Sequence, residues 1–276
     1  MPNIIVSHYA KGITMNDEIK NKLQSAKISG EEDLYKLFNE NYIFFTPYKN
    51  YFWLRYNEFK LLMSLFPNAI DKSMDVLEIG CGFGFNSLLM ATRAKSVLGV
   101  DIPEKYPSLV MGNEQTSVDV ARAVNNELKI KNVRFEHSWP TKIECCEDNA
   151  VNLIFSEYVF EHIPDLNAAI KEMHRCLKSG GGMLHVVPVT QDAVITFLKS
   201  QVEKSKERNS IRKLLSNIRN PVKIPGCHSE FLSDFSEQLD LYCLENYVFK
   251  LQENGFCIKD IKQTREHNRI IYAVKM

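Results

Sequence analysis

A glycine-rich loop follows a short apolar run in the first third of the chain. Gly80, Gly82 and Gly84 come directly after Val76–Ile79, and a helical pattern opens at about Phe85. Where a ligand lies against the backbone at the carboxyl edge of a parallel sheet, a Cβ atom would collide with it. The helix that follows would point its free N–H groups at an anionic part of that ligand. The loop is therefore typical of a site for a nucleotide-like ligand.

The spacing of these glycines separates two classes of ligand. Dinucleotide sites expect G-x-G-x-x-G, but the third glycine position holds Phe85 when counted from Gly80 and Ser87 when counted from Gly82. Glu78 stands just before the loop, where a carboxylate suits a ligand with cationic amino and sulfonium groups and repels a pyrophosphate. Asp101 can bind the ribose of either ligand. The pattern favours S-adenosylmethionine (SAM) over NAD.

Four motifs follow one another along the chain. They are E-I-G-C-G-F-G at 78–84, G-V-D at 99–101, E-Y-V-F-E-H-I at 157–163 and C-L-K-S-G-G at 176–181. In this order and at these separations they resemble the class I SAM-dependent methyltransferases, in particular their widespread small-molecule branch. The resemblance covers residues 75–189 well and the C-terminal end loosely. It implies a seven-stranded sheet with SAM lying over the strand ends.

The resemblance also implies which residues hold the cofactor. The loop would line the methionine part, Asp101 would bind the ribose, and Ser156 and Glu157 would flank the methyl group. Where this branch often carries an acidic residue for the adenine amino group, the chain has Ser138 and Trp139, a hydroxyl and a ring that can stack. The predicted cofactor residues are Glu78, Gly80, Cys81, Gly82, Gly84, Asp101, Ile102, Ser138, Trp139, Ser156 and Glu157.

Methyl transfer from a sulfonium is an in-line displacement, which leaves S-adenosylhomocysteine as the product. The main requirement is to hold acceptor, methyl carbon and sulfur collinear in a dry pocket. A base is needed only when the acceptor must lose a proton. The candidate catalytic residues are His162, His228 and Glu157, although the pattern E-H-I-P-D favours a scaffold role for His162. No His and carboxylate grouping has the spacing of metal ligands, so we expect no metal.

The surrounding pattern predicts an α/β fold with a doubly wound, mainly parallel sheet and helices on both faces. Five β-like runs, at 76–80, 97–101, 133–137, 151–156 and 182–187, alternate with helical stretches. Two further runs, 256–261 and 269–274, are spaced to pair as an antiparallel hairpin. We expect a helical cap over 1–73, a SAM-binding domain over 74–276, and a helical substrate-side insertion at about 190–226.

One helix before the fifth run shows its boundaries in the sequence. Pro164-Asp165 marks its start, and Leu166, Ile170 and Met173 form one apolar face. The triplet Gly180–Gly182 is expected to end it, because glycine tolerates the positive φ of a helix terminus.

The predicted cap contains an aromatic-rich stretch, 42–59, which we interpret as helices covering the site. Its tyrosines and Trp53 can either form an acceptor wall with a cation–π contact to the sulfonium or pack as core. Arg55 in the same stretch is a candidate for the carboxylate of SAM, although spacing alone does not place it there.

Composition restricts the partners. Lys plus Arg and Asp plus Glu both number 34, so no global field draws the protein to nucleic acid or anionic lipid. The apolar runs are far shorter than the roughly 20 residues of a membrane span, and no secretory signal is recognisable, so a cytoplasmic protein without membrane association is expected. Residues 199–223 hold eight basic and two acidic residues, which suits a phosphate-bearing acceptor, RNA or a solvated helix face.

Three alternatives to a small-molecule methyltransferase remain. A nucleic-acid methyltransferase is disfavoured, because the fourth β-like run ends in Phe155–Tyr158 rather than in the tetrad Asn or Asp, Pro, Pro, aromatic. An NAD-dependent oxidoreductase is disfavoured by the missing third glycine. A non-catalytic SAM-binding protein stays open. We expect a monomer or homodimer that acts on a sugar or secondary metabolite.

Overall fold

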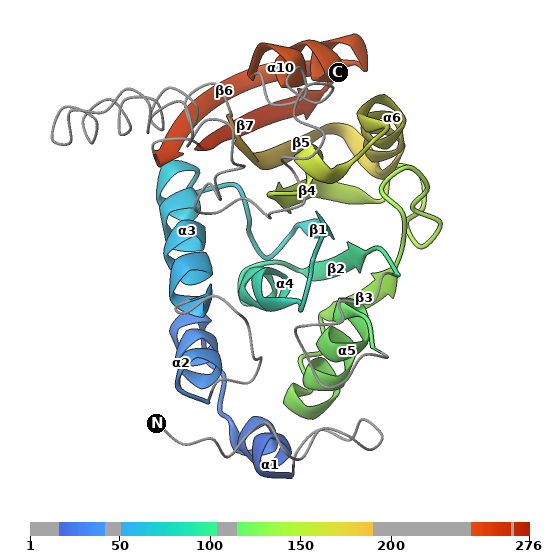
Figure 1. Ribbon diagram of the computed structural model, residues 1–276. Coiled ribbons are helices and arrows are strands. Elements are labelled where there is room, and N and C mark those ends of the chain that lie inside the picture. The colour runs from blue at the N-terminus through green and yellow to red at the C-terminus, as the bar shows by residue number, and fades with distance from the viewer. Residues whose placement is uncertain (1–16, 42–50, 104–114, 190–243, 266–267) are drawn as a thin grey trace, which may run out of the picture.

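The computed structural model describes residues 17–41, 51–103, 115–189, 244–265 and 268–276 (Figure 1). The helices are α1 (Asp17–Ser25), α2 (Glu31–Asn41), α3 (Tyr51–Leu65), α4 (Phe85–Ala91), α5 (Ser117–Leu128), η1 (Phe160–His162), α6 (Leu166–Cys176) and α10 (Leu244–Glu253). The strands are β1 (Asp75–Ile79), β2 (Ser96–Asp101), β3 (Val133–His137), β4 (Val151–Glu157), β5 (Leu177–Pro188), β6 (Phe256–Arg265) and β7 (Asn268–Lys275). Predicted residue His228 and the predicted insertion at 190–226 lie outside the described residues.

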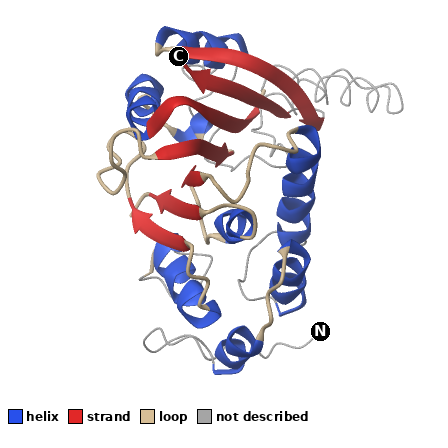
Figure 2. Cartoon of the chain, turned by 180° about the vertical axis from the view of Figure 1, so that it is seen from behind, coloured by secondary structure: helices blue, strands red, loops and turns tan. Residues whose placement is uncertain are grey.

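The described strands form one sheet in the order β3-β2-β1-β4-β5-β7-β6 (Figure 2). Strands β1 to β5 pair in parallel, and β7 pairs antiparallel with both β5 and β6. The sheet therefore confirms the predicted fold class, including the C-terminal antiparallel hairpin. Because β1 and β4 are neighbours at the centre, the loops that follow them meet at one edge of the sheet.

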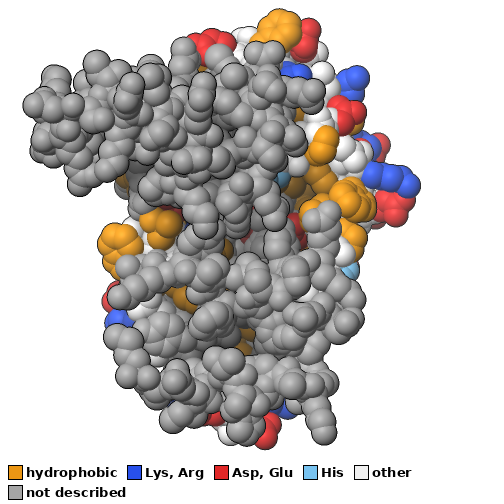
Figure 3. Space-filling view, viewed as in Figure 1, with side chains coloured by type: hydrophobic (Ala, Val, Ile, Leu, Met, Phe, Trp, Pro, Cys, Tyr) orange, Lys and Arg blue, Asp and Glu red, His pale blue; other side chains and the backbone are white. Residues whose placement is uncertain are grey.

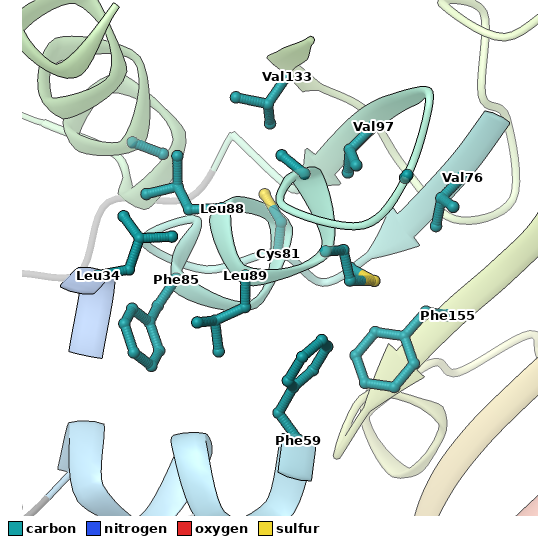
Figure 4. Close-up of a cluster of buried hydrophobic side chains, with 14 of the residues drawn as sticks. Leu34, Phe59, Val76, Cys81, Phe85, Leu88, Leu89, Val97, Val133 and Phe155 are labelled. Carbon is teal, nitrogen blue, oxygen red and sulfur yellow. The ribbon is translucent and has the colours of Figure 1, made fainter. Parts of the chain in front are cut away.

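Helices cover both faces of the sheet. Even-numbered residues of β1 and odd-numbered residues of β2, such as Val76 and Val97, join a buried cluster with Phe85 and Leu88 of α4 (Figure 4). Leu77 and Ile79 of β1 face the other way, into the cluster that α6 and α10 complete. This alternation follows from the period of two along a strand.

The N-terminal helices add a layer outside α4. Leu34 and Phe59 are buried in the same cluster as Phe85 (Figure 4). The rings of Phe38 and Phe52 each lie 5.1 Å from the ring of Phe85, centroid to centroid. Phe52 and Phe59 of the aromatic-rich stretch are thus core residues, whereas Trp53 is 51% exposed and residues 42–50 lie outside the described residues. Helix α3 runs along this layer toward β6 (Figure 1).

The prediction that Gly180–Gly182 ends a helix is wrong. Helix α6 ends at Cys176, and Leu177 already pairs with Val151 of β4. The pairing then shifts, so that Leu153 lies opposite Gly182. Gly180, with φ of 74°, lies in the extra residues of this bulge. The glycines therefore serve an irregularity inside β5, which sequence patterns for helix ends do not distinguish from a cap.

The described surface near α6 mixes side chains of both charges with apolar ones (Figure 3). Ion pairs there include Lys142 with Glu144, at 2.5 Å, and Arg175 with Asp148, at 2.6 Å. Among the described helices, none is long and apolar enough to cross a membrane.

Candidate functional site

The glycine loop turns back on itself at the end of β1. Gly80, Gly82 and Gly84 have positive φ angles of 73°, 51° and 81°. A Cβ on Gly80 would lie 2.2 Å from Val159, and a Cβ on Gly84 would lie 2.6 Å from the ring of Phe135. A Cβ on Gly82 would meet no described atom within 4 Å. Internal packing therefore demands two of these glycines, whereas no described residue fills the space beside Gly82.

Asp101 lies beside this open position. Its Oδ2 accepts a hydrogen bond from the Gly82 N–H at 2.7 Å, and its Oδ1 accepts one from Ile102 at 2.8 Å. The structure thus brings the predicted ribose-binding acid and the predicted loop together, at the carboxyl ends of β2 and β1.

Glu78 lies beneath the loop rather than at its open mouth. Its side chain is 2% exposed and accepts a short hydrogen bond from Ser87 of α4. Burial raises the pKa of Glu78 to about 8, the Ser87 hydroxyl opposes this shift, and the charges of Glu157 and Asp101 add to it. Carboxyl groups from three strands therefore converge near the loop.

At the end of β4, Ser156 and Glu157 point to different partners. Ser156 is fully buried, and its Oγ lies 2.6 Å from Nδ1 of His185 on the neighbouring strand. Burial lowers the pKa of His185 to about 3, so the ring is neutral near pH 7. Glu157 instead receives a hydrogen bond from Asn86 at 2.7 Å and an ion pair from Arg55 at 3.1 Å. Arg55 thus reaches the site through a carboxylate of the chain.

The predicted adenine residues follow β3. Ser138 donates its N–H to the carbonyl of Asp101 at 2.8 Å, and its hydroxyl donates to the carbonyl of Lys142 at 3.1 Å. Trp139 is 51% exposed. The backbone bond places both residues next to the end of β2.

Two titratable groups lie on η1, directly after the site strand. His162 is exposed, at the end of this turn. Glu161 is 8% exposed, and burial raises its pKa to about 8, opposed by the charge of Arg55. The sequence motif contains Glu161, but the candidate residues did not include it. Its burial depends on packing that the motif does not reveal.

Glu161 should make the stability of the protein depend on pH. Because its folded pKa lies above the ordinary value of 4.5, the folded chain holds this proton where the unfolded chain has lost it. Its contribution to stability is present below about pH 4.5 and is lost as the pH rises toward 8. Glu161→Gln should therefore reduce the fall in Tm between pH 5 and 8.5 by on the order of 5 °C, measured by calorimetry.

Glu172→Gln is the control for this prediction. Arg175 lowers the pKa of Glu172, so the pH dependence of this residue's contribution to stability has the opposite sign. The contribution of Glu172 is lost as the pH falls. Glu78 keeps part of the pH dependence in both variants. Equal Tm slopes for Glu161→Gln and the wild type over this range would contradict the prediction.

The described residues do not include His228, so its place relative to the site stays a prediction. Among the described residues, no three His, Cys, Asp or Glu side chains lie together as a metal site. The structure brings together the loop, Asp101, Ser138 and Glu157. It adds Asn86 and Ser87, and it pairs Arg55, already a candidate, with Glu157; these contacts appear only when distant strands and helices meet.

Comparisons with known proteins agree with this geometry. A family model described as a methyltransferase domain matches residues 70–246. The ubiquinone biosynthesis O-methyltransferase of Pseudomonas aeruginosa (strain LESB58) is 32% identical over 140 residues, which cover 47% of this chain and 54% of that protein. The uncharacterized methyltransferase YcgJ of Bacillus subtilis is 25% identical over 140 residues, 50% of each chain. This chain spans about half the length of the curated relatives that it matches.

Solved structures share the fold. A SAM-dependent methyltransferase from Aquifex aeolicus superposes with a TM-score of 0.52 at 17% identity, covering 77% of this chain and 88% of that one. The PH0226 protein of Pyrococcus horikoshii superposes with a TM-score of 0.56 at 18% identity, covering 83% and 93%. At these identities the likeness concerns the fold alone.

Proposed function

This chain belongs to the methyltransferase-domain family, and we propose that it moves a methyl group from SAM to an oxygen or nitrogen atom of a small-molecule acceptor. The observation that carries the proposal is the contact between Asp101 and the backbone of Gly82. Through this contact, a carboxylate that suits ribose hydroxyls lies next to Gly82. Of the three loop glycines, Gly82 is the one at which a Cβ atom would meet no described atom.

The charges of the described site fit the methyl donor. SAM carries a sulfonium and an ammonium group. The carboxylates of Glu157 and Asp101 both raise the pKa of Glu78, after burial, and a bound cation would relieve that repulsion. No described residue fills the space beside Gly82, which supports an approach of the ligand to these groups from that side.

Each predicted cofactor residue is assigned to one part of SAM. The methionine part of SAM would be held by the loop residues Gly80, Cys81, Gly82 and Gly84, with Glu78 beneath them. The ribose would be bound by Asp101 and Ile102, and the adenine by Ser138 and Trp139. The region of the methyl group would be flanked by Ser156 and Glu157. Ser156 would contribute its backbone, because its hydroxyl is bonded to His185.

SAM supplies an electrophilic methyl group. The chain has to orient the acceptor and exclude water. For an acceptor that must lose a proton, His162 and His228 are the candidate bases. Glu157 already accepts from Asn86 and Arg55, so we assign it an electrostatic part beside the cationic donor.

The acceptor class rests on two observations. The likeness to ubiquinone biosynthesis O-methyltransferases supports an oxygen acceptor on a small molecule. The basic stretch 199–223 supports an acceptor with a phosphate group, such as a sugar nucleotide.

The test is transfer of a labelled methyl group from SAM to fractions of a cell extract. We expect label in the small-molecule fraction, and mass spectrometry of the labelled compound identifies the methylated atom. Label that appears only in the RNA or protein fraction would contradict the proposed acceptor class. Cofactor binding without label in any fraction would indicate a non-catalytic SAM-binding protein.

A further inference from the structure

One partly buried guanidinium joins helix α3 to the end of the central strand β4. Nη1 of Arg55 on α3 lies 2.9 Å from Oε2 of Glu58 and 3.1 Å from Oε2 of Glu157 on β4. The three side chains are 18%, 7% and 6% exposed. Helix α3 therefore contributes directly to the charge distribution at the carboxyl edge of the sheet.

Tyr158 fixes the guanidinium from a second side. Its ring lies 4.6 Å from Arg55 in a cation–π contact, and its hydroxyl donates to Oε1 of Glu58 at 2.9 Å. The same hydroxyl accepts from Asn268 of β7 at 2.6 Å. Tyr158 has φ of 57°, which a tyrosine adopts only where surrounding contacts hold it. Arg55 thus has a set position.

Glu157 links Arg55 to the helix that follows the glycine loop. The Oε2 atom that pairs with Arg55 also accepts from Nδ2 of Asn86, in the first turn of α4 after the glycine loop. One carboxylate oxygen therefore has partners on α3 and on α4 at once. Movement of Arg55 would release Glu157 and would loosen its tie to the helix that follows the loop.

We propose that Arg55 is a positioning residue for the methyl-donor site, acting through Glu157. The inference rests on the proposed function. It assigns α3 a part in cofactor binding in addition to its part in the core. It differs from a direct contact between Arg55 and the carboxylate of SAM, because the guanidinium is engaged by the carboxylates of Glu58 and Glu157.

Positioning and simple charge balance predict opposite results. Without Arg55 the site gains net negative charge, which by itself would strengthen binding of a cationic ligand. If Arg55 instead holds Glu157 in place, its loss leaves two carboxylates without their shared partner and weakens binding. The sign of the change in SAM affinity therefore separates the two roles.

Arg55→Gln should raise the Kd for SAM by about tenfold, equivalent to about 1.4 kcal/mol, measured by titration calorimetry. The matched control is Arg93→Gln. Arg93 on the segment after α4 pairs with Glu31 of α2, so it also ties an N-terminal helix to the core, but its contacts do not reach the loop. Arg93→Gln should lower Tm and leave the Kd for SAM unchanged.

Arg55→Lys provides a second variant if Arg55→Gln does not fold. Lysine keeps the charge but lacks the planar guanidinium that lies over the ring of Tyr158, so partial rescue is expected, with a smaller rise in Kd. Wild-type or tighter SAM binding by a folded Arg55→Gln, or by Arg55→Lys if only that variant folds, would overturn the inference alone. Absence of SAM binding by the wild-type chain would overturn the proposed function and this inference with it.

Discussion

Gly82→Ala is expected to weaken SAM binding roughly tenfold to a hundredfold, equivalent to about 1.4–2.8 kcal/mol. The new methyl group would meet no described atom, so it would project into the open space that the proposal assigns to the cofactor. The φ of 51° adds a backbone strain of about 1–2 kcal/mol for a residue with a Cβ. Titration calorimetry measures the affinity, and thermal unfolding measures the strain.

Gly180→Ala separates the two effects. Gly180 has φ of 74° and equally open surroundings among the described residues, but it lies in the bulge at the start of β5, at the opposite end of the sheet. Both variants should therefore lose similar stability, whereas only Gly82→Ala should lose SAM affinity. Equal SAM affinities for the two variants would contradict the placing of the cofactor at Gly82.

Asp101→Ala should raise the Kd for SAM by about a hundredfold, because hydrogen bonds to a charged acceptor contribute about 1.5–3 kcal/mol each. The variant removes the proposed ribose acceptor and also leaves the N–H of Gly82 without the carboxylate that holds it at 2.7 Å. Calorimetric titration with SAM and with S-adenosylhomocysteine measures the effect, which should be similar for the two ligands since both carry the ribose.

Asp75→Ala is the matched control. Asp75 begins β1 at the far end of the sheet and also accepts hydrogen bonds, from Ser96 and from Lys95. Its loss should cost stability without changing the Kd for SAM. A Kd for Asp101→Ala within a factor of about two of that for Asp75→Ala would mean that Asp101 does not bind the ribose.

The loop and the sheet were accessible from the sequence because their signals are local. The run 133–137 matches β3 at both ends, since an apolar stretch between polar turns has few alternatives. The loop glycines are recognisable in the sequence because other residues are disfavoured there. All three positions have a positive φ, and close packing excludes a Cβ atom at two of them.

The partners of the site were not accessible, because they depend on contacts between distant residues. Arg55 and Glu58 stand three apart in an aromatic stretch, which signals a pair on one helix face. The contact with Glu157, about a hundred residues away, requires the tertiary fold. The same holds for Ser156, whose hydroxyl meets His185 on the next strand instead of facing the site.

Calorimetric titration of the wild-type chain with SAM, S-adenosylhomocysteine and NAD shows directly which cofactor the glycine loop binds. The contact between Asp101 and Gly82 predicts a site for a ribose, and the glycine spacing and the converging carboxyl groups predict that SAM and S-adenosylhomocysteine bind there and that NAD does not. Binding of NAD with no heat from SAM would contradict the account.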